Sequence, residues 1–314
     1  MPDIIALGEC MVEFFSDRPL GTATTFQRAY GGDTLNCLIA AVRLGSSCGY
    51  ITRVGDDSFG LALRRAWQEE GIDVSHAPLV PGFNGIYFIS LVPGGEREFT
   101  YYRGGSAAST VCPDDIDRSY VASARIVHAS GISQAISPTC RAAVKRLFEA
   151  ARQAGVRVSF DPNFRAKLWS VEEAREAADE ALPFVDILLP SVPEDSQALW
   201  GLDSPQAVAE HLRNRGIDIV AVKCGTDGAV VADTATGIVE ISAFTPDAPI
   251  IDTTGAGDAF NGAFLHGLCA GMPPTDAARL GVVTAGLKCR GRGAVASLPT
   301  REEVYGALGR PPPL

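Results

Sequence analysis

Short apolar runs alternate with amphipathic stretches along most of the chain. Residues 3–8 are mainly apolar and end in Gly8, a pattern typical of a buried parallel strand. Between residues 33 and 44 the apolar positions recur with helical spacing, and Gly45 follows where a helix C-terminal cap is expected. These two segments predict a strand followed by a helix.

The same alternation continues as far as residue 223. It predicts strands at residues 49–54, 126–129, 156–160, 185–189 and 217–223, and helices at residues 58–70, 137–154, 171–182 and 205–214. A hairpin is then expected at residues 229–232 and 238–241, followed by a Gly- and Ala-rich helical region at residues 256–290. Strands that alternate with helices form a mainly parallel sheet covered by helices, so the pattern predicts an α/β fold.

Two regions, residues 9–30 and 84–102, interrupt this alternation. In the second region, residues 86–91 and 98–102 flank a Pro93-Gly94-Gly95 turn and are typical of hairpin strands. Strands without crossover helices do not easily join a parallel sheet. We therefore expect one domain over residues 1–314, with a small β-sheet lid inserted from these two regions over one end of the α/β core.

Composition and charge narrow the class of protein. The 314 residues are 46% hydrophobic and 20% charged, close to the usual composition of a compact globular chain. The 37 acidic residues outnumber the 27 basic ones, and the resulting net charge of −10 repels a polyphosphate backbone. No apolar stretch approaches the roughly 18 residues of a membrane span, and the first residues carry no basic leader pattern. We expect a cytoplasmic protein that binds neither nucleic acid nor membranes.

Several chemical motifs are absent from the sequence. The eight cysteines contain no C-x-x-C pair, so we expect reduced and mostly buried thiols. The four histidines form no H-E-x-x-H, which leaves zinc chemistry without a framework. There is also no G-x-x-x-x-G-K-[ST] phosphate loop, no complete dinucleotide fingerprint and no G-x-S-x-G hydrolase motif.

The strongest local signal is a glycine-rich turn that runs into an apolar helix, Asp252-Thr253-Thr254-Gly255-Ala256-Gly257-Asp258. Free backbone N–H groups at a helix N-terminus bind anions. Asp258 is then either a helix cap or a base positioned beside a phosphate. The helix dipole is expected to lower the pKa of Asp258 and make it a weak base, which a loose phosphoryl-transfer transition state tolerates.

Four segments taken together extend this interpretation. They are Gly31-Gly32-Asp33-Thr34-Leu35-Asn36, Asp161-Pro162-Asn163-Phe164-Arg165, Lys223-Cys224-Gly225-Thr226-Asp227-Gly228 and the turn at residues 252–258. In order and spacing they resemble the ribokinase-like (PfkB) carbohydrate kinases, over nearly the whole chain. The resemblance implies the ribokinase-like fold, a three-layer α/β/α core with a mainly parallel sheet and a small β-sheet lid. It also implies a sugar kinase that uses ATP and Mg²⁺.

Further stretches narrow the resemblance within the family. They are Gly8-Glu9-Cys10-Met11-Val12-Glu13, Tyr101-Tyr102-Arg103, the segment Ser130-Gly131-Ile132-Ser133-Gln134-Ala135-Ile136-Ser137-Pro138, the segment Asn163-Phe164-Arg165-Ala166-Lys167-Leu168-Trp169, and Arg292-Gly293-Ala294. They are similar to the kinases that convert 2-keto-3-deoxygluconate to its 6-phosphate in sugar-acid catabolism. A sugar acid needs charge-assisted partners, and Arg103 and Arg165 are placed to clamp its carboxylate. The alternative to this clamp is that each arginine forms an ion pair with an acidic residue at the protein surface.

The resemblance also implies roles for individual residues. Asp258 takes the proton from the terminal hydroxyl, and Gly255, Ala256 and Gly257 form the anion hole for the transferred phosphoryl group. The implied sugar contacts are Gly32, Asp33, Asn36, Tyr87, Tyr101, Arg103 and Arg165. The implied nucleotide contacts are Ser191, Lys223, Gly225, Thr226 and Gly228, although the stretch from Lys223 to Gly225 also fits an ordinary strand end.

One departure from the family pattern concerns the metal. Where the family usually has N-x-x-E, this chain has Ser191-Val192-Pro193-Glu194, so the acid is kept and the amide is replaced. Glu194 is expected to organise Mg²⁺ through water, with phosphates as the main ligands. The resemblance also implies a site for a monovalent cation, K⁺, near Asp252 and Thr254, which the spacing alone does not establish.

Two other functions stay open. Within the same fold, a fructokinase or ribokinase-type enzyme would take a neutral sugar, and the arginine pair is the feature that discriminates. From another class, a sugar- or nucleotide-sensing protein would use the scaffold without catalysis, although Asp258 argues against it. Exposed edge strands tend to be covered, so we also expect a homo-oligomer formed through the lid.

Overall fold

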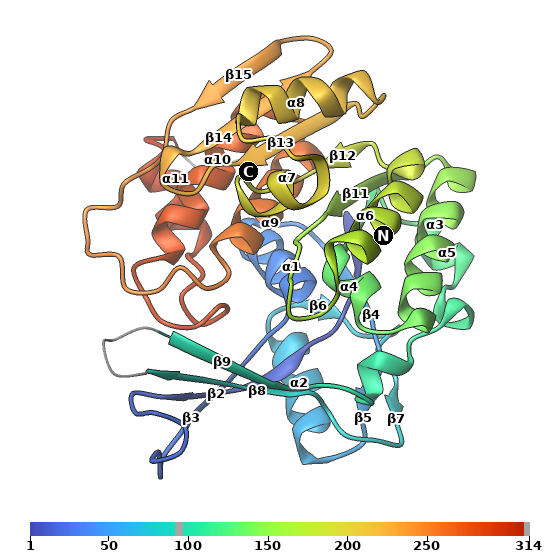
Figure 1. The fold of residues 1–314 in the computed structure, drawn as a ribbon, viewed down its shortest axis with the longest axis vertical. Coiled ribbons are helices and arrows are strands. Elements are labelled where there is room, and N and C mark those ends of the chain that lie inside the picture. The colour runs from blue at the N-terminus through green and yellow to red at the C-terminus, as the bar shows by residue number, and fades with distance from the viewer. Residues whose placement is uncertain (92–96, 311–314) are drawn as a thin grey trace.

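Figure 1 shows a large central sheet flanked by helices, with a smaller sheet set apart from it. The computed structural model describes residues 1–91 and 97–310. The central sheet has nine strands in the order β15-β14-β13-β12-β11-β10-β1-β4-β6. These are β1 (Ile4–Leu7), β4 (Cys48–Ile51), β6 (Ile72–Asp73), β10 (Ile126–Ser130), β11 (Arg157–Asp161), β12 (Ile187–Leu188), β13 (Ile219–Lys223), β14 (Ala229–Asp233) and β15 (Gly237–Ile241). Neighbours from β13 to β6 are parallel and the β14–β15 hairpin adds antiparallel strands, so the predicted α/β fold is confirmed.

The helices cover both faces of this sheet. The α-helices are α1 (Asp33–Leu44), α2 (Ser58–Glu69), α3 (Arg118–Ala122), α4 (Gly131–Ala135), α5 (Pro138–Ala154), α6 (Val171–Ala181), α7 (Glu194–Trp200), α8 (Pro205–Asn214), α9 (Ala256–Cys269), α10 (Pro274–Lys288) and α11 (Arg301–Ala307). The 3₁₀ helices are η1 (Ala107–Thr110), η2 (Pro113–Asp115), η3 (Leu182–Phe184) and η4 (Gly225–Asp227). Strand β1 is buried on both sides: Ile4 and Ala6 join the core with α1 and α9, whereas Ile5 and Leu7 join the core with α5. The three layers follow from this two-sided burial.

Two predicted elements are each divided in the structure. Residues 49–54 end β4 and begin β5 (Val54–Gly55), which leaves the central sheet to pair with β7 (Leu79–Val80). Residues 256–290 form two helices, because Gly271 takes a positive φ of 78° and Pro273 follows just before α10. Apolar spacing reports which residues are buried rather than where the chain turns, so it does not reveal either break.

The smaller sheet is the lid. Its order is β3-β2-β8-β9, formed by β2 (Met11–Ser16), β3 (Gln27–Gly31), β8 (Ile86–Leu91) and β9 (Arg97–Tyr102). The central pair β2–β8 is parallel and the two outer pairs are antiparallel. The expected turn at Pro93-Gly94-Gly95 lies outside the described residues. Strand β1 leads directly into β2, so the lid lies at the carboxyl end of the parallel strands (Figure 1).

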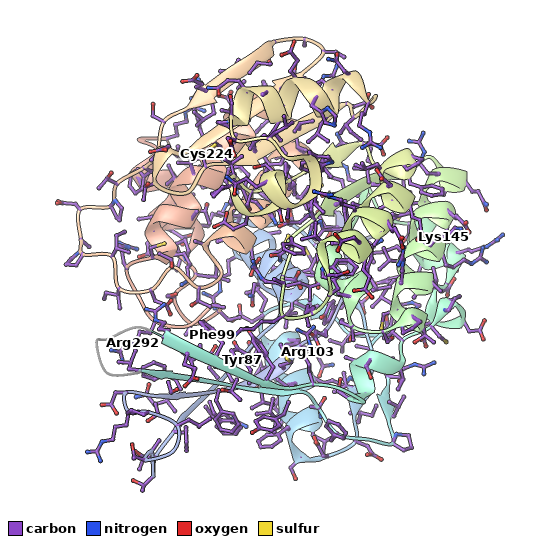
Figure 2. All side chains as sticks on the ribbon, in the orientation of Figure 1. Tyr87, Phe99, Arg103, Lys145, Cys224 and Arg292 are labelled. Atoms are coloured by element: carbon purple, nitrogen blue, oxygen red, sulfur yellow. The ribbon has the colours of Figure 1, made fainter. Side chains whose placement is uncertain are left out.

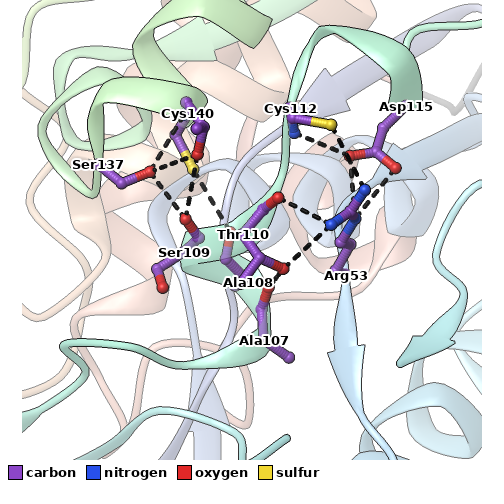
Figure 3. Close-up of polar contacts among 10 residues, drawn as sticks. Arg53, Ala107, Ala108, Ser109, Thr110, Cys112, Asp115, Ser137 and Cys140 are labelled. Atoms are coloured by element: carbon purple, nitrogen blue, oxygen red, sulfur yellow. Dashed lines mark hydrogen bonds and ion pairs between the residues drawn. The ribbon is translucent and has the colours of Figure 1, made fainter. Parts of the chain in front are cut away.

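The segment that returns from the lid to the core is held by polar contacts (Figure 3). Arg53 donates from Nε to Asp115 over 3.0 Å and from a terminal nitrogen to the carbonyl of Thr110 over 2.9 Å. On the other side, the Ser137 hydroxyl donates to the carbonyl of Ser109 over 2.7 Å. These contacts join η1 and η2 to the core, so the segment that follows lid strand β9 is held in place.

The cysteines agree with the expectation from their spacing. All eight are free thiols and six of them are buried. Burial raises the pKa of Cys140 and Cys269 to about 11, which keeps both as unreactive thiols near neutral pH. Within residues 1–91 and 97–310, no helix combines the length and the apolar character needed to cross a membrane.

Gly228 offers a test of the packing between η4 and β15. It has a positive φ of 99°, and a Cβ built on it would lie 2.1 Å from the carbonyl oxygen of Ile241. We expect Gly228→Ala to lower the free energy of unfolding by about 3 kcal/mol or more, because backbone strain and a backbone clash act together. Chemical denaturation followed by circular dichroism measures this change.

Gly155→Ala is the matched control. Gly155 also has a positive φ, of 71°, but a Cβ there meets nothing within 4 Å. The control therefore measures the cost of a side chain in the αL region, about 1–2 kcal/mol. Gly228 has a ψ of −122°, outside that region, so its own backbone strain is included in the larger loss. Equal losses in the two variants would show that the contact with Ile241 carries no extra cost.

Candidate active site

A cavity of about 1240 Å³ lies between the lid and the carboxyl ends of the parallel strands. Figure 2 places Tyr87, Phe99 and Arg103 along the side of the lid that faces the core. Most residues selected from the sequence line this cavity: Gly32, Asp33, Asn36, Tyr87, Tyr101, Arg103, Arg165, Ser191, Glu194, Lys223, Gly225, Thr254, Gly255, Gly257 and Asp258. The remaining four, Ala256, Thr226, Gly228 and Asp252, are not part of its wall.

Asp258 is not the cap of its helix. The N-cap of α9 is Gly255, which has a positive φ of 78° and no capping side chain. The Asp258 carboxylate instead accepts a hydrogen bond of 2.8 Å from the side-chain amide of Asn36, on α1. Two helices from distant parts of the sequence therefore hold this carboxylate at the cavity wall.

The pKa of Asp258 is raised to about 7, in the opposite direction to the sequence-based expectation. Burial is the largest cause, and the negative charge of Asp33 adds to it. The hydrogen bond from Asn36 lowers the pKa by a smaller amount. The expected effect of the helix dipole was wrong in direction because desolvation and a second carboxylate outweigh it. A carboxylate with this pKa is a stronger base than an ordinary aspartate.

The N-terminus of α9 presents free N–H donors to the cavity. The amide of Ala256 donates to the carbonyl of Thr253 over 3.1 Å, so it is already satisfied within the turn. The amides of Gly257 and Asp258 find no acceptor in the described part of the chain. The Lys223 ammonium lies beside them, 3.9 Å from where a Cβ on Gly257 would be. Donors and positive charge thus meet at one place, as an anion site requires.

The start of α1 forms the adjoining part of the wall. Gly32 has extended backbone, and a Cβ on it would lie 1.9 Å from the carbonyl oxygen of Glu9, so only glycine permits this approach. Next to it, one carboxylate oxygen of Asp33 accepts a hydrogen bond of 3.0 Å from the side chain of Asn163. The other oxygen is buried and has no partner among the described residues. It is available to accept a hydrogen bond from a ligand hydroxyl.

Two tyrosines line the lid side of the cavity. The rings of Tyr87 and Tyr101 stack with their centroids 5.8 Å apart. The Tyr87 hydroxyl donates a short hydrogen bond to the buried Glu13. Burial raises the pKa of both tyrosines, so both are neutral phenols near neutral pH. Because the Tyr87 hydroxyl is engaged by Glu13, the part of Tyr87 left to face the cavity is its ring. Tyr101 is more exposed than Tyr87.

The two arginines of the expected clamp are not equivalent. Arg103 forms a close ion pair with Glu9, which is only 2% exposed and whose pKa burial raises to about 7. Arg165 is exposed at the cavity wall, donates to its neighbour's carbonyl over 3.3 Å, and forms no ion pair with any described residue. Lys167 is a second exposed cation on the same wall. Arg165 and Lys167 are thus the cations left for an external anion.

The other end of the cavity rests on a buried polar network. Lys223 pairs with Asp161 over 2.5 Å, and the side chain of Asn261 donates to the same carboxylate over 2.6 Å. The buried Asp195 accepts hydrogen bonds of 2.7 Å from the amides of Ser191 and Phe164. This network positions the strand ends that carry the expected nucleotide contacts. Gly228, by contrast, packs against β15 as described above.

Carboxylates near the cavity are suited to water-mediated rather than direct metal binding. Within the described residues, no group of three or more His, Cys, Asp or Glu side chains is arranged to hold a metal ion. Glu194 is exposed on the cavity wall and has no hydrogen bond or ion pair with a described residue. A free carboxylate beside an anion site fits a hydrated Mg²⁺ held mainly by phosphates.

Several residues at the site were missed at the level of the sequence. Asp161 and Asn163 follow a predicted strand just as Arg165 does, and Glu9 follows the first strand, so strand-end position was an available signal. Arg97, on β9, carried no comparable signal. Its place beside Asp252 depends on how the lid lies over the core.

Comparison with known proteins identifies the family of this chain. Residues 1–301 match the family described as pfkB family carbohydrate kinase. The chain is 36% identical to the 2-dehydro-3-deoxygluconokinase of Thermoproteus tenax, over 96% of this chain and 93% of that protein. It is 33% identical to the protein of the same name from Escherichia coli (strain K12), over 93% of this chain and 96% of that protein.

A solved structure shares both the sequence pattern and the fold. The crystal structure of a PfkB protein from Polaromonas sp. JS666 has 35% identity and a TM-score of 0.87, over 97% of this chain and 99% of that one. The match covers nearly the whole of both chains, so the fold is shared over the lid as well as the core. The chain therefore belongs to the pfkB family of carbohydrate kinases.

Proposed function

We propose that this protein transfers a phosphoryl group from ATP to the 6-hydroxyl of 2-keto-3-deoxygluconate. The observation that carries the substrate assignment is Arg165, a cation at the cavity wall without an ion pair to any described residue. Membership of the carbohydrate kinase family supports the reaction, and the names of the relatives support the sugar. A neutral sugar, as in a fructokinase or ribokinase-type enzyme, would leave Arg165 without a charged partner.

The carboxylate end of the sugar is assigned to the side of the cavity with unpaired cations. Arg165 supplies a planar pair of donors that suits a carboxylate, and Lys167 adds a second positive charge. Arg103 is already neutralised by Glu9, so its part in the clamp is to offer N–H donors rather than net charge. Tyr87 and Tyr101 cover the sugar from the lid, and Gly32 lets the start of α1 come close to it.

Asp258 takes the proton from the attacking hydroxyl. Its carboxylate is oriented by Asn36, and the raised pKa makes it a competent base at neutral pH. The free oxygen of Asp33 accepts a hydrogen bond from another hydroxyl of the sugar and so fixes the orientation of the sugar. Closing the lid over the bound sugar excludes water, which limits hydrolysis of ATP.

The transferred group lies at the N-terminus of α9, beside Lys223. The free amides there stabilise the charge that develops on the phosphoryl oxygens. Gly255 sets the turn, and Ala256 supports it through its bond to Thr253. The nucleotide lies along Ser191, Lys223 and Gly225, with Thr226 and Gly228 shaping the loop behind them. Mg²⁺, when bound, neutralises phosphate charge, and Glu194 holds its water shell.

The outer face of the lid supports a proposal about assembly. Phe14, Phe26 and Phe88 form an aromatic cluster joined by Tyr102, which is 61% exposed. Exposed aromatic residues on a small sheet are usually covered by a partner. We infer that this face joins two copies of the chain in a homo-oligomer. The cytoplasmic location stays a prediction from the sequence.

Asp258→Asn tests the base. The variant keeps the hydrogen-bonding shape but cannot accept the proton, so we expect kcat to fall by about 10²–10⁴ while nucleotide binding persists. Coupled ADP release measures kcat, and the exposed Asp114→Asn is the control. Turnover within about twofold of the unmodified enzyme would remove Asp258 from this role.

The pH profile tests the electrostatic origin of the raised pKa. Asp258 acts only when deprotonated, so with a pKa of about 7, kcat/KM should fall about tenfold per pH unit below that value. Asp33→Asn removes the neighbouring negative charge and lowers the pKa of Asp258, so the acid limb should move to lower pH. An unmoved limb would contradict this account.

Glu9 is the other group whose pKa is raised to about 7, so Glu9→Gln is the control for that profile. The acid limb should persist in this variant if Asp258 is its source. Its disappearance would assign the limb to Glu9.

Arg165→Ala tests the substrate class. Loss of a charged partner for a desolvated carboxylate should lower kcat/KM for 2-keto-3-deoxygluconate by about 30- to 1000-fold. Any activity on fructose or ribose should change by less than about threefold, because neutral sugars do not need that charge. Arg146→Ala, on α5, is the control. A uniform loss across acidic and neutral sugars would argue against the clamp, and a preference of the unmodified enzyme for a neutral sugar would overturn the assignment.

A further inference from the structure

Asp252, just before the turn into α9, is surrounded by donors from its own chain. One carboxylate oxygen accepts from the Arg97 guanidinium over 2.5 Å and from the amide of Thr254 over 2.8 Å. The other accepts from the amide of Gly293 over 2.8 Å. Its carbonyl oxygen accepts from the Lys288 ammonium, also over 2.8 Å. Every oxygen of this residue is therefore engaged.

Lys288 is the least usual member of this group. It is the last residue of α10 and is 0% exposed, although it carries an ammonium group. A buried ammonium is strongly unfavourable unless it is paired and hydrogen-bonded. Here Asp252 supplies both a carbonyl acceptor and a nearby negative charge, and the carboxylate of Glu13 also acts on Lys288. Asp252 therefore offsets part of the cost of burying this ammonium.

These contacts do not fit a monovalent metal ion near Asp252 and Thr254. Such an ion needs several free oxygen ligands, whereas the oxygens of Asp252 already accept N–H donors. The Thr254 hydroxyl also accepts from Arg97, over 3.4 Å. An added ion would also lie beside the Arg97 guanidinium and the Lys288 ammonium, and both positive charges repel it. The K⁺ site implied by the family resemblance is therefore disfavoured in this chain.

We propose that Lys288, assisted by Arg97, serves as the built-in cation of this turn, so that the enzyme works without a monovalent metal ion. Both are positioning residues. They hold Asp252 and the turn behind it, and the turn sets the direction of the amides at the N-terminus of α9. Arg97 comes from lid strand β9 and also donates to the carbonyl of Ile251 over 2.8 Å, so the lid contributes to the brace. This inference does not depend on which sugar the enzyme accepts.

The first experiment replaces K⁺ by tetramethylammonium at constant ionic strength. We expect kcat to differ by less than about twofold between the two salts. Saturable activation by K⁺ of about fivefold or more would overturn the proposal. The thermal unfolding midpoint, measured without substrate in the same two salts, should be equal, and a K⁺-specific rise would also overturn it. This second readout needs no turnover, so it is independent of the proposed sugar.

Lys288→Met removes the ammonium but keeps the length of the apolar stem. In the folded variant we expect kcat to fall by about 10- to 100-fold with a much smaller change in KM, since binding groups remain in place. We also expect K⁺, but not tetramethylammonium, to restore part of the activity. Lys145→Met, on the exposed side of α5 and labelled in Figure 2, is the matched control. A folded Lys288→Met with normal kcat would overturn the proposal.

Arg97→Gln covers the case in which Lys288→Met does not fold. The Arg97 side chain is 28% exposed, so its replacement leaves the core intact. We expect kcat to fall by about 3- to 30-fold with little change in the unfolding midpoint. Unchanged kcat would show that the guanidinium does not brace the turn.

Discussion

Carboxylates gathered at the carboxyl end of the parallel sheet impose the main constraint on this molecule. Burial raises the pKa of Asp258, and the negative charges of Asp33 and Asp161 raise it further. Each of the three needs a partner, which is Asn163 for Asp33, Lys223 for Asp161 and Asn36 for Asp258. Burial and this repulsion together leave Asp258 with the proton affinity of a base, so the packing of the site also sets its chemistry.

The lid belongs to this electrostatic arrangement as well as covering the cavity. Arg103 on the segment after β9 neutralises Glu9, and Arg97 at the start of β9 pairs with Asp252. A further contact involves Arg292, which is labelled in Figure 2. Its guanidinium carbon lies over the ring of Phe15, 4.8 Å from the ring centroid. Charged residues at both ends of strand β9 thus form ion pairs with residues outside the lid. Movement of the lid would expose these pairs to water, which couples its position to the state of the site.

The elements themselves were largely predictable because they depend on local pattern. Helix α1 begins at Asp33 and ends at Leu44, as its apolar spacing and Gly45 indicate. The cavity was predictable for a similar reason: ends of parallel strands meet at one edge of the sheet, so Arg165 and the residues around Gly32 had to lie near one another. The break at β5 was missed because the chain stays mostly buried across it, and the break between α9 and α10 was missed because both flanking segments are rich in small and apolar residues.

The order of strands and helices along the chain, the lid and the segments that meet at the cavity all follow from the pattern of residues in the sequence. The pairing of the charges at the cavity does not, and it is visible only in the folded chain: Arg103 lies with Glu9, Lys288 with Asp252, and Asp258 beside Asp33. Secondary structure follows from neighbours along the chain, whereas electrostatic energies depend on distance and burial in space. The dipole of one helix is a local property, and it was outweighed by groups that folding brings from elsewhere.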